Sequence, residues 1–129
     1  MAASRRVHFE LFVQEMGVAV AVYTGAMGFD LLCEEPGYAS LRRGEVILGL
    51  GPISKLPAED EYFTRHISGH RRGLGVELVL EVDDLDGYHA RILASEYEIS
   101  EPLRERPWGL RDFRVVDPDG YYLRITSRA

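Results

Sequence analysis

Residues 108–125 read WGLRDFRVVDPDGYYLRI and predict two strands joined by a tight turn. The turn is Asp-Pro-Asp-Gly at 117–120, where proline fixes φ and glycine supplies the left-handed corner. Side chains after the turn alternate between two faces, with Tyr121, Leu123 and Ile125 on one and Tyr122, Arg124 and Thr126 on the other. This alternation indicates a strand that is buried on one face.

The same stretch resembles the last hairpin of the vicinal oxygen chelate superfamily, which includes glyoxalase I, extradiol dioxygenases and the bleomycin-resistance proteins. The resemblance implies an α+β fold of two βαβββ units that form a curved mixed sheet around a cleft. In the metal enzymes of this family, a glutamate four residues after the turn glycine is a metal ligand. Here that position holds Arg124.

The composition limits the class of protein. The chain has 129 residues, enough for one compact domain with a hydrophobic core. No apolar run approaches the ~20 residues of a membrane helix, and the first residues lack the apolar core of a signal peptide. The single cysteine, Cys33, is expected to be a small buried side chain in a protein of the reducing cytoplasm. The net charge of −6 argues against duplex nucleic acid as a partner.

The sequence predicts the same strand pattern twice. Residues 7–13 and 76–82 both alternate between apolar and polar side chains, so each predicts the first strand of a unit. Three more strands are expected in each unit, near 29–34, 38–43 and 45–50 in the first and near 96–99, 111–116 and 121–126 in the second.

A helix is expected after the first strand of each unit. In the second unit, Asp83 or Asp84 is a suitable N-cap, and Leu85, Tyr88 and Ile92 are spaced to form one buried face. In the first unit, residues 18–23 have no clear 3.6-residue period, and the repeat is the reason to expect a helix there. The segment 23–29 resembles a helix end of the family, with Gly28 as the C-terminal stop.

These elements predict a single domain over residues 1–129. The first unit is expected at about 6–51 and the second at about 75–127, with a linker at about 52–74. The linker is rich in proline, glycine and charged residues, and a short helix near 58–66 is compatible with it.

The resemblance implies four metal-ligand positions, on the first and last strands of each unit. By local motif they fall on His8, Leu48, Glu77 and Arg124. Leu48 offers no ligand atom, and a guanidinium cannot coordinate a divalent cation. A catalytic metal needs about three protein ligands and one open position. The sequence therefore predicts no metal site and no other cofactor.

Two interpretations of Arg124 remain open. In the first, Arg124 neutralises Glu77 at the place where the family binds its metal. In the second, Arg124 is a solvent-exposed side chain at the end of a strand.

A second candidate metal-binding cluster lies in the linker. His66 and His70 have the i, i+4 spacing of a helical zinc site, and Glu59 and Glu61 are near in sequence. Gly69 weakens a helix at this point, so a charged linker is the better interpretation.

Aromatic side chains complete the predicted site. Trp108 lies between Pro107 and Gly109, in a loop expected to overhang the cleft. The predicted ligand-binding residues are Trp108, Tyr38, Phe12, Phe113, Tyr122, Arg124, Glu77 and His8. An aromatic lining suits a planar or hydrophobic organic ligand. For each strand aromatic, core packing is the alternative.

The incomplete metal quartet favours the bleomycin-resistance type of protein, in which a cytoplasmic homodimer sequesters a drug without chemistry. The expected partner is a small molecule, an antibiotic with planar aromatic groups, and binding is expected to give drug resistance. No nucleic-acid or membrane partner is expected. Two alternatives are a metal-dependent lyase, isomerase or dioxygenase with an altered site, and an accessory protein that uses the fold for association.

Overall fold

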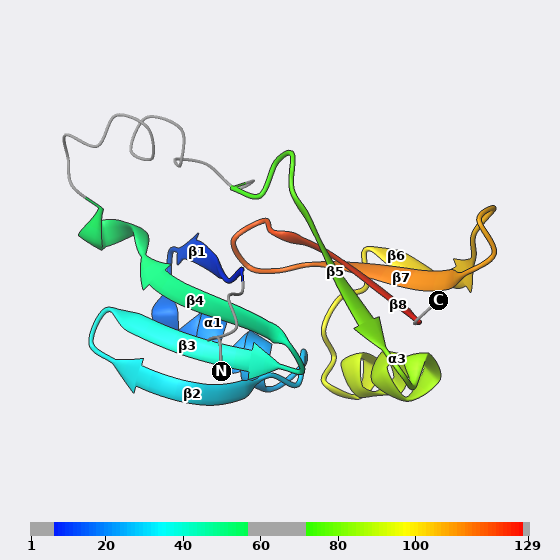
Figure 1. Ribbon diagram of the computed structural model, residues 1–129, viewed down its shortest axis with the longest axis horizontal. Helices are drawn as coiled ribbons and strands as arrows, with labels where there is room; N and C mark the ends of the chain where they lie inside the picture. The colour runs from blue at the N-terminus through cyan, green and yellow to red at the C-terminus, as the bar shows by residue number, and fades with distance from the viewer. Residues whose placement is uncertain (1–6, 57–71, 128–129) are drawn as a thin grey trace, which may run out of the picture. The chain divides into compact units, whose positions relative to one another are not determined.

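The computed structural model describes residues 7–56 and 72–127. The chain forms two compact units, residues 1–64 and 65–129. Within the described residues, each unit has one four-stranded mixed sheet and one α-helix (Figure 1). Each unit runs βαβββ along the chain, with its first strand beside its last. The α+β fold expected from two βαβββ units is therefore confirmed.

The first unit is a sheet with strand order β1-β4-β3-β2 and one helix packed on it. The elements are β1 (Phe9–Val13), α1 (Met16–Thr24), β2 (Asp30–Glu35), β3 (Tyr38–Arg43), β4 (Val46–Pro52) and the 3₁₀ helix η1 (Ile53–Lys55). β1 pairs with β4 in parallel, and the other neighbours are antiparallel. The parallel pairing of β1 and β4 needs a long connection, and α1, β2 and β3 together provide it.

Helix α1 forms although its sequence lacks a helical period, and it packs on the sheet through two buried side chains, Ala19 and Tyr23. Tyr23 is fully buried and meets the edge of the Phe29 ring, with 5.6 Å between the ring centroids. The helix ends at Thr24, and the Gly25 amide donates to the Ala21 carbonyl. Gly28 does have a left-handed φ of 72°, but it lies beyond the helix end, so its predicted role as the stop is wrong.

The second unit repeats this arrangement with strand order β5-β8-β7-β6. Its elements are β5 (Glu77–Val82), α3 (Leu85–Ala94), β6 (Glu101–Glu105), β7 (Arg111–Val116) and β8 (Tyr122–Ser127). β5 and β8 are parallel, and β8, β7 and β6 are antiparallel neighbours.

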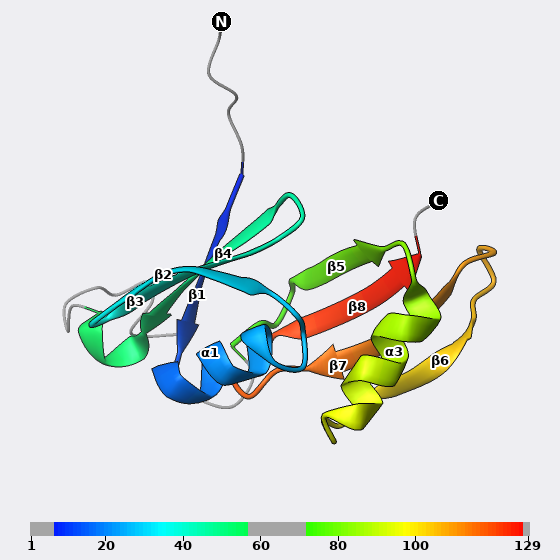
Figure 2. The ribbon, with the colours of Figure 1, turned by 90° about the horizontal axis from the view of Figure 1, so that it is seen from below.

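Helix α3 covers one face of the second sheet (Figure 2). The Asp84 carboxylate accepts a hydrogen bond of 3.0 Å from the Gly87 amide, which confirms the predicted N-cap. Leu85, Tyr88 and Ile92 are buried as expected, and the Tyr88 ring lies 6.4 Å from that of Phe113.

The turn between β7 and β8 is closed by the carboxylate of Asp117. One of its oxygens accepts from the amides of Asp119 at 2.9 Å and Tyr121 at 2.8 Å. Gly120 has a φ of 94°, the left-handed corner that the sequence required.

Two further expectations are wrong. The strand predicted at 96–99 is found at Glu101–Glu105, because Glu96 has a left-handed φ of 60° and Tyr97 donates through its hydroxyl to the Val116 carbonyl at 2.6 Å. Burial raises the pKa of Tyr97 to about 12, with nearby carboxylates adding to the rise. Cys33 is exposed on the edge strand β2.

The helix expected near 58–66 and the histidines His66 and His70 lie outside the described residues. Across the described ranges, no helix has both the length and the apolar character needed to span a bilayer.

Candidate functional site

Each sheet has one face against its helix and an opposite face that no described helix of the unit covers. We call the second the open face. On the second unit, strand alternation and pairing register place three side chains from each of three strands on the open face: Glu77, Val79 and Glu81 of β5, Tyr122, Arg124 and Thr126 of β8, and Asp112, Arg114 and Val116 of β7.

An ion pair lies on the open face where the family resemblance implies a metal. Arg124 Nε is 2.9 Å from Glu77 Oε1, with the two side chains 24% and 39% exposed. The Arg124 guanidinium also lies over the ring of Trp108, 6.0 Å from its centroid, in the range of a cation–π contact. Glu77, Arg124 and Trp108 are therefore brought together, and the contact of Arg124 with Glu77 is the first of the two interpretations that the sequence left open. The interpretation of Arg124 as a side chain directed only to solvent is wrong.

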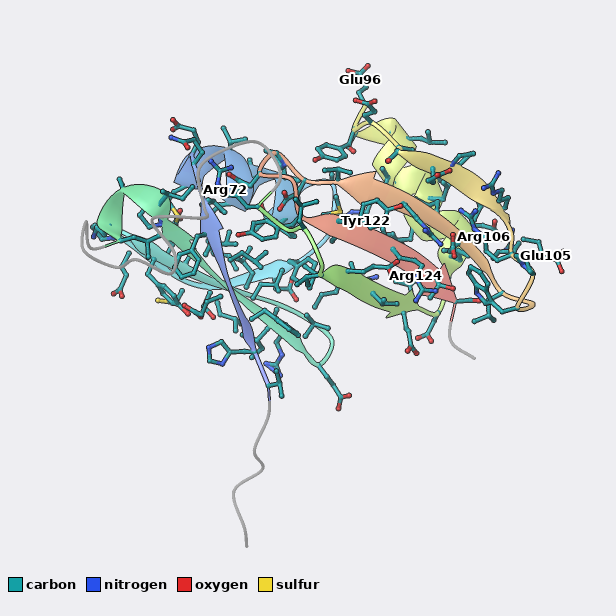
Figure 3. All side chains as sticks on the ribbon, turned by 90° about the horizontal axis from the view of Figure 1, so that it is seen from above. Arg72, Glu96, Glu105, Arg106, Tyr122 and Arg124 are labelled. Atoms are coloured by element: carbon teal, nitrogen blue, oxygen red, sulfur yellow. The ribbon has the colours of Figure 1, made fainter. Side chains whose placement is uncertain are left out.

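A second arginine lies beside Tyr122. The Arg114 guanidinium is 6.0 Å from the centre of the Tyr122 ring, and its Nη1 lies 3.5 Å from the Tyr122 hydroxyl. The hydrogen bond with Tyr122 raises the pKa of Arg114, and Asp112 also favours the charged form. Figure 3 shows Tyr122 and Arg124 on the same strand, β8.

A buried ion pair holds the hairpin that carries Trp108. Arg106 Nε donates to Asp112 Oδ1 at 2.7 Å, and their side chains are 8% and 0% exposed. Arg114 Nε is 3.5 Å from the same Asp112 oxygen. The hairpin is closed by the Arg106 amide, which donates to the Leu110 carbonyl at 2.8 Å. Trp108, at the tip, is 55% exposed.

A pocket of about 560 Å³ lies at the other end of this face. It is lined by Gly73, Leu74, Gly75, Val76, Glu77, Ser100, Val116, Gly120 and Tyr122. The segment before β5 forms one wall, and Arg72 fixes it to the β7–β8 turn through a 3.2 Å ion pair with Asp119. Gly73 packs so closely against the Tyr121 backbone that a Cβ would lie 2.8 Å from its Cα. Two of the predicted ligand-binding residues, Glu77 and Tyr122, line this pocket.

The open face of the first unit carries a polar network. Glu10 Oε2 accepts from the Tyr38 hydroxyl at 2.9 Å and lies 3.1 Å from His8 Nε2. Burial raises the pKa of Tyr38, with its hydrogen bond to Glu10 as the second cause. The network covers Gly49, where a Cβ would collide with the Glu10 carboxylate and the Tyr38 hydroxyl. Two predicted residues, His8 and Tyr38, therefore meet through Glu10.

The predicted equivalence of Leu48 and Arg124 is wrong. Leu48 pairs with Leu41 and is 1% exposed on the helix face of its sheet. In the second sheet, Arg124 pairs with Val79, which lies two residues after Glu77. In the first sheet, the residue two after His8 is Glu10, and its partner is Gly49. Gly49 is therefore the equivalent of Arg124. The position still offers no side-chain ligand atom.

The other two predicted aromatics differ in position. Phe12 is half-buried and alternates with Glu10 on the open face of β1. Phe113 is fully buried on the opposite face, against Tyr88 and His89 of α3, so it does not line the open face. The sequence interpretation missed Arg106, Asp112 and Arg114. Asp112 and Arg114 could have been found from the register of β7, because residues that alternate with Phe113 share the face of Arg124.

The sequence agrees with a known family over nearly its whole length. A sequence model described as Glyoxalase/Bleomycin resistance protein/Dioxygenase superfamily matches residues 5–125. The comparison with curated proteins found no match.

Several solved structures share the fold. TioX from Micromonospora sp. ML1 is 25% identical, with 96% of this chain and 100% of that chain covered and a TM-score of 0.75. A bleomycin resistance determinant encoded on the transposon Tn5 is 18% identical, with 97% and 98% covered and a TM-score of 0.70. A lactoylglutathione lyase from Agrobacterium tumefaciens is 18% identical, with 98% and 96% covered and a TM-score of 0.69. The family match and the paired βαβββ units show that this chain belongs to the glyoxalase/bleomycin resistance protein/dioxygenase superfamily.

Proposed function

We propose that this protein binds and sequesters a small organic molecule with a planar aromatic group, such as an aromatic peptide antibiotic, without chemically changing it. Sequestration of this kind would give drug resistance. The binding surface is the open face of the second unit, from the pocket beside Tyr122 to the Trp108 hairpin.

The observation that carries the proposal is the ion pair between Arg124 and Glu77. Arg124 is always charged and lies at a position where the metal enzymes of the family have a metal ligand. It forms an ion pair with Glu77, whose carboxylate would otherwise be able to bind a metal. In the first unit the equivalent position is Gly49, which has no donor atom. Each unit therefore lacks one of the donors that the metal sites of the family use, and the open face of the second unit keeps a wall for an organic ligand.

Two further features support an aromatic ligand. Trp108 is exposed but has one ring face near Arg124, so its position is partly fixed before a ligand arrives. A fixed aromatic ring contributes stacking area at a low cost in conformational entropy. The bleomycin resistance determinant of Tn5 shares the fold, which is compatible with a drug-binding role.

Replacing Trp108 by Ala is expected to weaken binding of planar aromatic compounds by ~1–3 kcal/mol. The reason is loss of stacking area, and calorimetric titration with 1-naphthoate and 1-naphthamide as simple planar probes measures it. In the unmodified protein the same compounds should quench the fluorescence of Trp108, which is the only tryptophan.

The matched control is Leu93→Ala. Leu93 is also 55% exposed, but it lies on α3 and away from the open face. The Leu93→Ala variant should have the same affinity for both probes and the same stability as the unmodified protein. If Trp108→Ala binds both probes as tightly as the unmodified protein does, the proposed ligand site is wrong.

We also propose that the protein works as a homodimer in the cytoplasm, because drug-sequestering members of the family pair their chains to complete the cleft, and two-fold pairing is the commonest closed assembly. Sedimentation equilibrium at micromolar concentration should give about twice the chain mass of 14.6 kDa. A monomer mass throughout the concentration range would refute the dimer.

A further inference from the structure

We propose that the ligand carries a negatively charged group, and that this group is bound between Arg114 and Arg124 beside Tyr122. This inference rests on the proposed binding function and adds the chemical class of the ligand: an organic anion, such as a carboxylate, with a planar apolar body.

The first observation is the pairing of two arginines across neighbouring strands. Arg114 and Arg124 are directly opposite in the β7–β8 register, and both side chains lie on the open face. Like charges directly opposite on a sheet destabilise it. Both arginine side chains are partly buried, at 22% and 24% exposed, so solvent screens their repulsion less than at a free surface. An anion between them would remove this repulsion.

The second observation is that the neighbouring carboxylates do not neutralise both arginines. Glu77 contacts Arg124 at 2.9 Å. The carboxylate nearest Arg114 is Asp112, but the same Asp112 oxygen already accepts the shorter, 2.7 Å hydrogen bond from Arg106. Two carboxylates therefore face three guanidiniums.

The remaining carboxylates of this face do not change this balance. Glu101 is directly opposite Arg114 in the β6–β7 register, but its ion pair among the described residues is with Arg104 on its own strand, at 3.9 Å. Glu81 lies on the exposed edge strand β5, two residues beyond the partner of Arg124, and makes no ion pair among the described residues.

The third observation is a set of buried donors without acceptors. The Nε atoms of Arg114 and Arg124 and one terminal nitrogen of Arg106 are buried and have no hydrogen-bond partner among the described residues. Asp112 Oδ2 is the one buried acceptor of this cluster that also has none there, so three such donors stand against one acceptor. For Arg114 and Arg124 a carboxylate is near, but not in hydrogen-bonding geometry. Arg106 is itself 92% buried, since only 8% of it is exposed. Buried donors without partners destabilise a fold, and they commonly mark a missing ligand, water or ion.

The pocket lies directly beside the two arginines. Val116 follows Arg114 on the same face of β7, and Tyr122 precedes Arg124 on the same face of β8. Both Val116 and Tyr122 line the pocket. Figure 3 shows Tyr122 and Arg124 as neighbours along β8. A ligand with its apolar body in the pocket would present a charged substituent to the arginines.

The test compares 1-naphthoate with 1-naphthamide, which have the same ring and nearly the same shape but differ in charge. Calorimetric titration of the full chain should give a dissociation constant about 10-fold lower for 1-naphthoate, because charge-assisted hydrogen bonds to guanidinium are stronger than neutral ones. The preference should fall to about threefold or less in Arg114→Gln and in Arg124→Gln. Two separate variants are used so that either one decides the result if the other does not fold.

Two further variants complete the test: one is a control, and one is expected to bind 1-naphthoate more tightly. Arg111→Gln is the matched control, because Arg111 is on the same strand as Arg114 but contacts Asp86 of α3 on the helix face. It should keep the full preference for 1-naphthoate. Glu77→Gln frees Arg124 from its carboxylate and should tighten 1-naphthoate binding about threefold, since an exposed ion pair is worth little more than that.

The outcomes separate this inference from the proposed function. If 1-naphthamide binds as tightly as 1-naphthoate, the anion site is wrong and aromatic binding stands. If the preference persists in both arginine variants, the charge is recognised elsewhere and the inference is also wrong. If neither compound binds at millimolar concentration, both proposals are rejected.

Discussion

Replacing Arg106 by Met is expected to lower the free energy of unfolding by about 3 kcal/mol. Asp112 is fully buried, and its shortest contact is the 2.7 Å hydrogen bond from Arg106. Without Arg106, the one cation left beside this carboxylate in the described part of the chain is Arg114, at 3.5 Å. A buried charge that loses its partner is far more costly than the loss of the pair as a whole.

Urea denaturation followed by circular dichroism measures this effect. The control is Arg104→Met on the same hairpin, where the side chain is 59% exposed, and the expected change is within about 0.5 kcal/mol. The double variant Arg106→Met/Asp112→Leu should recover much of the loss, because an apolar pair of similar volume can replace a buried ion pair. If Arg106→Met is as stable as Arg104→Met, the buried pair does not support the hairpin.

Replacing Phe113 by Ala is expected to lower the free energy of unfolding by about 3–5 kcal/mol. Phe113 is fully buried, with the His89 ring 4.9 Å and the Tyr88 ring 6.4 Å from its own, so its removal leaves a cavity under α3. Binding of 1-naphthoate below the melting temperature should be unchanged, because Phe113 lies on the helix face.

Tyr122→Ala is the comparison for this result. Tyr122 is half-buried on the open face of the adjacent strand. Its removal should therefore weaken the binding of 1-naphthoate and lower the free energy of unfolding less than the removal of Phe113 does. If Phe113→Ala abolishes binding and keeps its stability, the assignment of Phe113 to the core is wrong.

Features set by local chemistry could be predicted from the sequence. The Asp84 cap, the buried face of α3 and the left-handed Gly120 depend on residues within a few positions of each other. The contact between Glu77 and Arg124 was one of two alternatives that the sequence left open, and it came from the family resemblance, which related two strands that pair in parallel.

Features set by register could not be read from local motifs. The local motif places the ligand position at Leu48 because Leu48 follows the turn glycine Gly44 by four residues, as Arg124 follows Gly120. The residues that close the β3–β4 turn, Arg43 and Val46, lie on the helix face of their sheet, however. The residues that close the β7–β8 turn, Val116 and Tyr122, lie on the open face of their sheet. Strand side chains alternate with a period of two, so an offset of one residue exchanges the faces.

Two other errors came from tertiary context. The 96–99 segment looks like a strand, but Tyr97 is anchored to the Val116 carbonyl and pairing with β7 begins only at Glu101. Cys33 was expected in the core from the usual burial of cysteine, but β2 is an edge strand with every residue exposed. A single sequence does not show which strand is at the edge.

The most direct test of the account is the metal content of the purified protein after dialysis against zinc, nickel or iron. Since Arg124 and Gly49 stand at two of the four ligand positions, elemental analysis should find no stoichiometric metal, and 1-naphthoate should bind equally well with and without a chelator. One metal ion per chain that is lost in a His8→Ala variant would contradict this account, and would point to the metal-dependent lyase, isomerase or dioxygenase alternative.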